Sequence, residues 1–358
     1  MSIEWIAGAV LPNISTQKPL EGGAVALVPH DDPRVLDFCN TSPNFKDFLS
    51  RFTDAFGVTL YPVVLMVQKA YLSQLGNVNA LASFRDIVAA STVPYGRAMA
   101  SNFPNGGQRI SYSNSFWLYP WMVGTDNEHL VLNTPAMNAF HMVEEFHGQS
   151  SPEMPEKSLK DVDEPLFEAL LVRWKRFYLG KRPHWRDRAL FRSLNMAVNA
   201  AALPAGIDTT LYDLGRIAAL WVSSFEILAH PPKKGKSGLH TVYPMLEKVA
   251  YFNPKHAKKR YAAYVNRNKP WPRRTLTCWL YGKLYKARCD FLHGNPVSPK
   301  TLNPASLKDS MFWFAPGLYR LALTGFLDLK LKTGDDASHY RRLQYQREIE
   351  RALWKARK

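Results

Sequence analysis

Apolar residues recur at helical spacing through most of the chain after residue 160. In the first such segment, Leu166, Leu170 and Trp174 fall on one face of a helix predicted between Pro165 and Gly180. Further helices are predicted over residues 186–203, over 210–229 with a Thr210–Asp213 capping box, over 245–252, over 275–295, over 306–329 in two pieces around Pro316, and over 339–358. This pattern predicts an all-α bundle.

The first part of the chain instead has short apolar runs bounded by turn residues. Strands are predicted at residues 24–30, 109–123 and 129–135, and the second of these is rich in aromatic residues and partly alternating. Residues 82–91 have a helical pattern. We therefore expect a mixed, partly β domain, and no known fold is recognisable in its pattern.

The two patterns together predict an α+β protein with two domains. A chain of 358 residues is longer than the ~150 residues typical of one domain. The segment 149–156 is rich in Ser and Pro, and it is predicted to be a loop between the domains. Residues 1–155 then form the mixed α/β domain, and residues 156–358 form the all-α domain.

Charge separates the same two parts of the chain. Residues 1–150 contain 8 Lys and Arg against 12 Asp and Glu, and the remaining residues contain 38 against 18, so the net charges are −4 and +20. No acidic residue occurs from Lys248 to Cys289. The cations in and near this window form the basic run, which consists of Lys255, Lys258, Lys259, Arg260, Arg267, Lys269, Arg273, Arg274, Lys283 and Lys286.

Two interpretations of the basic run are open. An isolated run of charges is usually a solvated loop. Here it is interleaved with Tyr251, Tyr261, Tyr264 and Trp271, a mixture typical of surfaces that bind RNA phosphates and stack bases.

Cysteine usage and hydropathy predict a soluble protein of the cytoplasm that does not associate with a membrane. Cys39, Cys278 and Cys289 are too few and too far apart for a disulfide framework or a zinc knuckle. The N-terminal segment carries Glu4 where a secretory signal would be positive, and no apolar run reaches the ~18 residues of a membrane span. No cofactor is expected.

A group of potential metal ligands lies at His141, Glu144, Glu145 and His147. The two histidines are six positions apart, which separates them by ~240° around a helix. The zinc-binding pair of metalloprotease helices is spaced by four positions. No metal site is therefore predicted.

The helix predicted over 275–295 ends in LYKARCDFLHGN, where four residues separate Arg288 from His293. A His followed by Gly is typical of a plain helix end. A functional interpretation is also available, because an imidazole can remove the proton of a ribose 2′-hydroxyl and a guanidinium can stabilise charge on a phosphoryl group. Five positions apart, the two side chains point ~140° apart, so they converge only if the last turn loosens near Gly294 or if a second chain contributes.

Together with the upstream segment LWVSSFEILAHP, residues 220–231, this segment resembles the HEPN superfamily and in particular its Apea-like branch. That pattern has an Arg, four to six residues and then a His, which is commonly followed by Gly. The match covers at best the second half of the chain. It departs from the family at Cys289, where a small polar residue is usual.

The resemblance implies a helical bundle that acts as a metal-independent endoribonuclease. It also implies a homodimer in which two motifs face one cleft. By the same resemblance, Glu226 and Asp290 are candidates for orienting Arg288 or the imidazole. The alternative for both acids is an ordinary surface role, such as an ion pair with a neighbouring Lys or Arg.

The leading hypothesis is therefore a HEPN-type endoribonuclease in bacterial defence or a toxin-like role. His293 would be its general acid/base, and Arg288 would stabilise the phosphoryl transition state. The N-terminal domain would select the target or bind a regulatory partner. The main alternative, which Cys289 favours, is a catalytically silent HEPN module that binds RNA, a nucleotide or a partner protein. A third hypothesis is a structural interaction protein whose N-terminal domain recognises the partner.

Overall fold

The computed structural model describes residues 4–54, 56–105, 109–126, 128–133, 137–147, 156–202, 209–232, 235–266, 270–329 and 337–357. The chain folds into two compact units. Unit 1 comprises Met1–Arg85, Asn114–Lys160 and Trp174–Lys181, and unit 2 comprises Asp86–Ser113, Asp161–Arg173 and Arg182–Lys358. The helices α4 (Val78–Asn102) and α5 (Glu164–Tyr178) contribute residues to both units. These units are discontinuous in sequence, unlike the single boundary predicted near residue 155.

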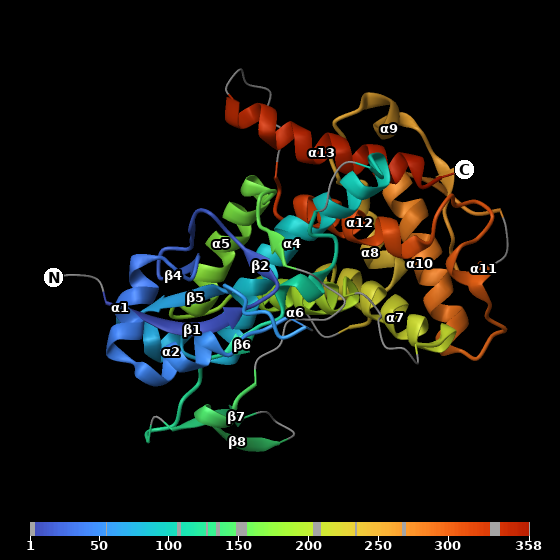
Figure 1. Ribbon diagram of the computed structural model, residues 1–358. Helices are drawn as coiled ribbons and strands as arrows, with labels where there is room; N and C mark the ends of the chain where they lie inside the picture. The colour runs from blue at the N-terminus through green and yellow to red at the C-terminus, as the bar shows by residue number, and fades with distance from the viewer. Residues whose placement is uncertain are drawn as a thin grey trace. The chain divides into compact units, whose positions relative to one another are not determined.

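Unit 1 is built around a five-stranded sheet in the order β3-β4-β5-β1-β6 (Figure 1). Its strands are β1 (Trp5–Leu11), β3 (Leu20–Glu21), β4 (Val25–Val28), β5 (Val63–Gln68) and β6 (Tyr119–Pro120). All neighbouring strands pair antiparallel, and the register of β1 against β5 shifts at Gly8. Residues 25–28 and 63–67 are buried throughout, which explains why they form continuous apolar runs rather than an alternating pattern.

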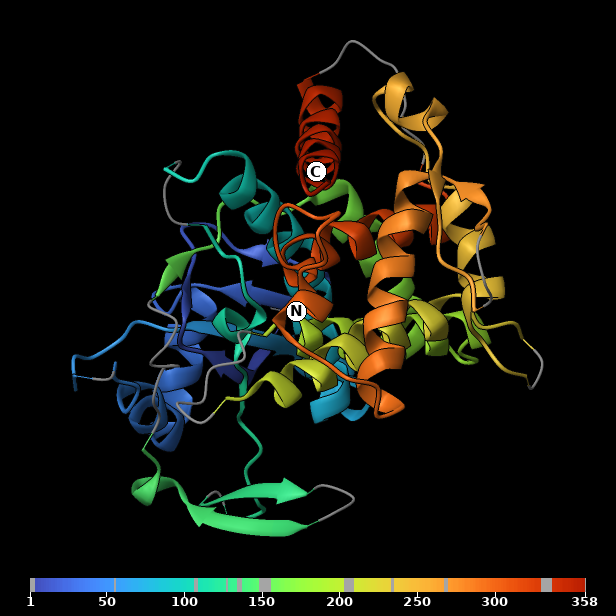
Figure 2. The same ribbon diagram turned by 90° about the vertical axis from the view of Figure 1, so that its right-hand side faces the viewer.

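Helices cover both faces of this sheet. On one face, α1 (Pro33–Thr41) and α2 (Pro43–Ser50) bury Val35, Phe45 and Phe48 against side chains of β1, β4 and β5. On the other face, the start of α4 brings Leu81 and Phe84 against the sheet. The smaller elements of unit 1 are β2 (Ile14–Ser15), η1 (Lys69–Tyr71), α3 (Leu72–Leu75), η2 (Ser113–Phe116), β7 (His129–Asn133), β8 (Asn138–Met142), η3 (Val143–Glu145) and β9 (Lys157–Ser158). Within this unit, the β7–β8 hairpin extends away from the five-stranded sheet (Figures 1 and 2).

Most of the predicted elements of unit 1 are confirmed. The strands predicted at 24–30 and 129–135 are β4 and β7, and the helix predicted at 82–91 lies within α4. The strand predicted over 109–123 is wrong, because this segment forms η2 and only the two residues of β6. Its aromatic residues are held by packing rather than by a strand ladder. The predicted loop at 149–155 lies outside the described residues.

Unit 2 is predominantly helical. Its elements, besides parts of α4 and α5, are α6 (Trp185–Ala200), α7 (Leu211–Leu228), α8 (Leu239–Glu247), α9 (Pro254–Lys258), β10 (Tyr261–Ala262), β11 (Arg273–Arg274), α10 (Leu276–Leu292), α11 (Pro299–Leu302), α12 (Met311–Phe326) and α13 (Ala337–Lys355). Helix α10 packs against α7, α8 and α12. Trp221, Phe225, Leu280, Tyr281 and Leu321 are almost completely buried in this core.

The predicted α+β class is confirmed, as are the helices that became α5, α6, α7, α10 and α13. The capping box is also confirmed, since Asp213 Oδ2 accepts a hydrogen bond from Thr210 N at 2.8 Å. The helix predicted over 245–252 is wrong in its bounds, because α8 starts at Leu239 and contains Pro244. The break predicted around Pro316 is also wrong, because α12 continues through it. Among the described residues, no helix is both long and apolar enough to cross a membrane.

Candidate functional site

The C-terminal turn of α10 is regular. The main-chain N–H of His293 donates to the carbonyl of Cys289 at 3.0 Å, and Gly294 has a φ of +69°. This is the left-handed helix end that a Gly favours. The turn does not loosen before His293, so the side chains of Arg288 and His293 point ~140° apart around the helix.

The two residues also differ in their surroundings. Arg288 is partly buried, whereas His293 is exposed beyond the last residue of α10. Among the described residues, no hydrogen bond or ion pair joins them. In the part of the chain that the structure describes, Arg288 and His293 therefore form no direct pair.

The predicted acidic residue Glu226 does lie near Arg288. Glu226 is partly buried on α7, the helix that packs against α10. Burial raises the pKa of Glu226, and the positive charges of Arg288 and then His240 oppose this rise. Arg288 Cζ also lies 5.9 Å from the centre of the Tyr285 ring. The guanidinium thus lies near an aromatic ring of its own helix and within electrostatic range of a carboxylate of the neighbouring helix.

His240 is a residue that the sequence analysis missed. It lies exposed in the first turn of α8, where its charge acts on Glu226. A Cβ atom added to Gly238 would lie 3.7 Å from His240 Nδ1 and 4.0 Å from Tyr285 Oη, which places the start of α8 beside Tyr285. We call the group Glu226, His240, Tyr285 and Arg288 the Arg288 cluster.

Three separate helices contribute to the Arg288 cluster, so no spacing along the chain reveals it. His240 was predicted to lie outside a helix, because the helix was placed over 245–252. The available local signal was the Gly238–Thr241 pair that starts α8, where Gly238 N donates to Thr241 Oγ1 at 3.0 Å.

Tyr281 lies one turn before Tyr285 in α10 and is fully buried. Its hydroxyl has no hydrogen-bond partner among the described residues. Burial raises the pKa of Tyr281 well above its usual value, and the charge of Glu226 adds to the rise while that of Arg288 opposes it. Tyr281 therefore remains neutral beneath the charged members of the Arg288 cluster.

Asp290, the second predicted acidic partner, binds residues of its own helix end. Its carboxylate pairs with Lys286 Nζ at 2.6 Å and accepts a hydrogen bond from Asn295 Nδ2 at 3.2 Å. The i,i+4 spacing of Lys286 and Asp290 is that of an ordinary helix surface pair. In the described part of the chain, the carboxylate of Asp290 forms no hydrogen bond or ion pair with Arg288 or His293.

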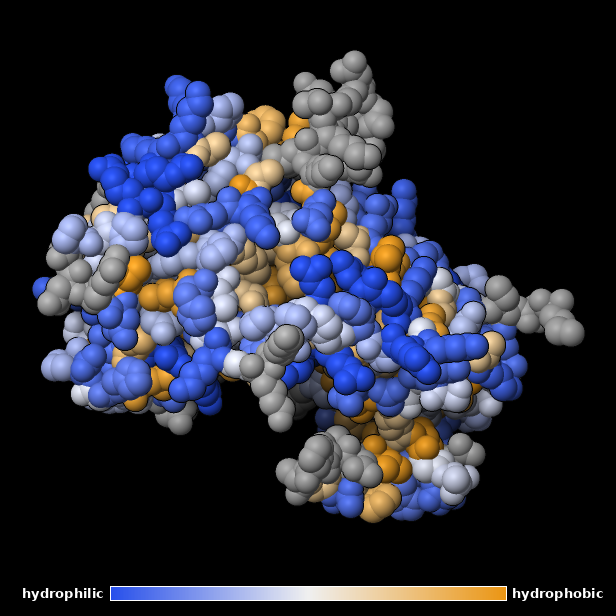
Figure 3. Space-filling view, turned by 180° about the vertical axis from the view of Figure 1, so that it is seen from behind, coloured by the Kyte–Doolittle hydropathy of each residue, from blue (hydrophilic) through white to orange (hydrophobic). Residues whose placement is uncertain are grey.

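The basic run begins on α9 and continues through the β10–β11 hairpin into α10. Its exposed members are Lys255, Lys258, Lys259, Arg260, Arg273 and Lys286, and its partly buried members are Arg274 and Lys283. Arg274 pairs with Glu247 at 2.5 Å, and Lys283 Nζ lies 5.2 Å from the centre of the Trp279 ring. Arg267 and Lys269 lie outside the described residues. Hydrophilic side chains dominate the surface around α9 (Figure 3).

Aromatic contacts connect the basic run to the Arg288 cluster. The ring of Tyr264, which follows β10, lies 6.4 Å from that of Tyr285 and 5.3 Å from that of Trp271. A Cβ atom added to Gly282 would lie only 3.1 Å from Tyr264 N, so a larger residue there would push the hairpin away from α10. Tyr251 has a structural role, because its hydroxyl bonds to Thr277 Oγ1 at 3.0 Å.

The residues considered for a metal lie on two short elements of unit 1. His141 is on the strand β8, and Glu144 and Glu145 are in the 3-10 turn η3. In the described ranges, no three His, Cys, Asp or Glu side chains are gathered as metal ligands. The chain matches no protein-family model, no curated protein and no solved structure.

Proposed function

We propose that the chain is a metal-independent endoribonuclease of the HEPN type. The observation that carries this proposal is the Arg288 cluster, in which three helices bring a guanidinium, a partly buried carboxylate and an imidazole to one end of α10. The proposal includes a role in bacterial defence or a toxin-like role, in which the first part of the chain selects the target. This role is based on the resemblance to the HEPN superfamily alone.

The proposed reaction needs no metal. An imidazole removes the proton of the ribose 2′-hydroxyl, and the 2′-oxygen bonds to phosphorus while the bond from phosphorus to the 5′-oxygen breaks. The 5′-oxygen takes up a proton. The products end in a 2′,3′-cyclic phosphate and a 5′-hydroxyl.

Arg288 and Glu226 have distinct tasks in this reaction. Arg288 stabilises the charge that builds on the phosphoryl oxygens, because its guanidinium is always charged and presents a rigid fork of donors. Glu226 is a positioning residue, since its carboxylate attracts the guanidinium electrostatically.

Two imidazoles are available for the proton transfers. His293 serves as the general acid/base when a second copy of the chain places it opposite Arg288, as in the dimer that the resemblance implies. His240 is available within the same chain, since it lies in electrostatic range of Glu226. Replacing each histidine separately distinguishes the two arrangements.

The test is cleavage of a labelled, structured RNA by the purified protein in EDTA. The wild type and the control His141→Ala, an exposed histidine on β8, should form 2′,3′-cyclic phosphate ends. Arg288→Ala should lose activity by about 100-fold or more, as is typical for removal of a charge stabiliser. An equal loss is expected in His293→Ala for the dimer arrangement and in His240→Ala for the arrangement within one chain, because each removes the general acid/base. Cleavage that all the variants retain equally, or that requires an added metal, would contradict the proposal.

A catalytically silent HEPN module that binds RNA is the second candidate. It is supported by the exposed cations Lys255, Lys258 and Arg260, which have no carboxylate partner among the described residues. Replacing Lys258, Lys259 and Arg260 with Glu should weaken RNA binding and reduce the slope of log affinity against log salt by about 2, if each residue contacts a phosphate. An unchanged affinity and slope would assign the basic run to solvent. RNA binding by the wild type without cleavage of several substrates would favour this module over the nuclease.

A further inference from the structure

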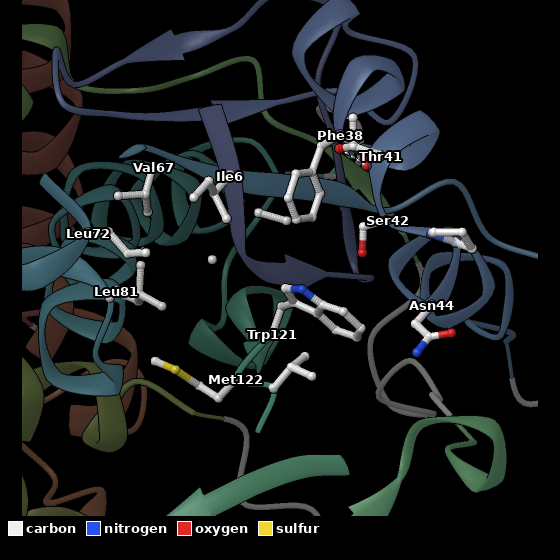
Figure 4. Close-up of a pocket in the computed structure, with 15 residues that line it drawn as sticks. Ile6, Phe38, Thr41, Ser42, Asn44, Val67, Leu72, Leu81, Trp121 and Met122 are labelled. Atoms are coloured by element: carbon white, nitrogen blue, oxygen red, sulfur yellow. Dashed lines mark hydrogen bonds between the residues drawn. The ribbon is translucent and has the colours of Figure 1, made fainter. Parts of the chain in front are cut away.

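Unit 1 contains a cavity of about 610 Å³ beside the start of β1 (Figure 4). Its apolar walls include Ile6, Phe38, Leu72, Leu81, Trp121 and Met122. The volume lies within the range of about 300–1,000 Å³ that is typical of small-molecule sites. The cavity belongs to unit 1 alone and has no part in the ribonuclease proposal.

The cavity exists because β6 is too short to cover the edge of β1. β6 pairs with β1 only at Ala9 and Val10, and Trp121 N then donates to Gly8 O at 2.9 Å. Beyond this bond the chain leaves β1, and no described strand pairs with Ile6 on the edge of β1 opposite β5. The register shift at Gly8 lies at the same point, and bulges of this kind are common next to binding sites.

Gly8 allows α4 and the side chains of β5 to lie close to β1. A Cβ atom there would lie 2.9 Å from Leu81 Cδ2 and 3.1 Å from Val67 Cγ2. A larger residue at this position would therefore displace walls of the cavity. The absence of a side chain lets β1, β5 and α4 approach closely while the cavity beside β1 stays open.

The chemistry of the lining selects a neutral ligand. No ionisable side chain lines the cavity. Because a charge buried against apolar walls without a partner is unfavourable, the part of a ligand that these walls cover must be uncharged. Figure 4 shows the rings of Phe38 and Trp121 directed into the cavity, where they offer flat apolar surfaces to a planar ring.

One hydroxyl at the cavity is available for a ligand. Thr41 Oγ1 donates to Phe38 O at 3.0 Å, so this hydroxyl is already occupied. Ser42 stands at the N-cap of α2 but makes no capping bond with its side chain. Its hydroxyl has no partner among the described residues, and Figure 4 shows it on the side of the cavity that Trp121 borders.

We propose that this cavity binds a neutral small molecule that has a planar apolar ring and one hydrogen-bonding group. The ring contacts Phe38 and Trp121, and the polar group bonds to the hydroxyl of Ser42. No residue of the Arg288 cluster takes part.

Indole is a suitable probe, because it is neutral and planar and has one N–H donor. We expect saturation-transfer NMR to detect indole on the full-length chain, and its affinity should exceed that of anionic indole-3-acetate and cationic tryptamine. Ser42→Phe should abolish binding by occupying the part of the cavity where the ring and the polar group of the ligand bind, whereas Ser50→Phe, an exposed position of the same helix, should leave it unchanged.

The hydrogen bond is tested with a second pair of compounds. Loss of one such bond should weaken indole about two- to tenfold in Ser42→Ala, which barely changes the shape of the site. 1-Methylindole lacks the N–H, so its affinity should not change in Ser42→Ala. Absence of indole binding, equal binding by Ser42→Phe, or equal affinity for the charged analogues would each overturn the proposal.

Discussion

Removal of the Glu350 side chain should release the start of the basic run from α13. Glu350 is 2% exposed, and its carboxylate is the acceptor for four donors. These are Phe252 N at 2.5 Å, Asn253 N at 3.1 Å, Gln346 Nε2 at 2.7 Å and His256 Nδ1 at 3.3 Å. Since Asn253 is the N-cap of α9, this carboxylate holds the helix that carries Lys255 and Lys258.

The expected magnitude follows from these donors. Glu350→Ala leaves two main-chain N–H groups and two side-chain donors without their acceptor. Each buried donor left unsatisfied costs about 1–3 kcal/mol, and structural relaxation and water recover part of this, so we expect a loss of about 3–5 kcal/mol. Glu350→Gln keeps one acceptor oxygen, and it should lose less than Glu350→Ala.

Urea unfolding and amide hydrogen exchange together test this prediction. Exchange should accelerate at residues 252–258 in Glu350→Ala, because local release of α9 precedes global unfolding. Glu247→Ala is the matched control, since Glu247 is another carboxylate that contacts this region, where it pairs with the basic-run residue Arg274 at the surface. It should cost no more than about 1 kcal/mol.

The reasoning would be refuted by a loss below about 1 kcal/mol in Glu350→Ala with unchanged exchange at residues 252–258. That result would mean that water replaces the carboxylate without cost. The experiment does not depend on the proposed function. If the basic run binds RNA, however, Glu350→Ala should also weaken that binding, and Glu247→Ala should leave it near the wild-type value.

Three further predictions concern the stability of unit 2. Arg320→Met should lower the free energy of unfolding in urea by about 3–5 kcal/mol, because it leaves the buried carboxylate of Asp163 without the guanidinium that lies 2.7 Å from it. Replacing both residues with apolar ones should recover part of this loss. Gly96→Ala should cost about 1–3 kcal/mol, since its Cβ would overlap the carbonyl oxygen of Ile110, and an unchanged midpoint would contradict this contact. Because the pKa of Glu226 is raised, its contribution to the free energy of unfolding is fully present below the usual pKa of 4.5 and is lost as pH rises through the raised pKa. Glu226→Gln should therefore flatten this part of the dependence of stability on pH. Parallel curves for the wild type and the variant would contradict this prediction.

Local sequence determined the α+β fold class and most of the helices of this protein. Helices α5, α6, α7 and α10 follow from apolar spacing and from end signals such as the Thr210–Asp213 capping box and Gly294. These signals act within one or two turns, so they remain readable without knowledge of distant residues. The buried run of β4 and the apolar run of β7 were predicted for the same reason.

Tertiary packing decided the elements that local rules assigned wrongly. Helix α12 continues through Pro316 although an internal Pro costs about 3 kcal/mol, because the apolar residues around it, such as Leu318 and Leu321, are fully buried. The segment 109–123 has strand-like residues, but only Tyr119 and Pro120 pair with β1, at Val10 and Ala9. Neither competing interaction is visible from the local pattern.

For the candidate site too, some features were apparent from the sequence and others were decided only by tertiary packing. The spacing of Arg288 and His293, and the geometric difficulty that five positions impose on a helix, were apparent from the sequence. Only the packing of α7, α8 and α10 decided that Arg288 and His240 both lie within electrostatic range of Glu226. The physical reason is that helix periodicity specifies which face of a helix is buried, whereas the partners across that face are chosen by the complementary shapes of whole helices.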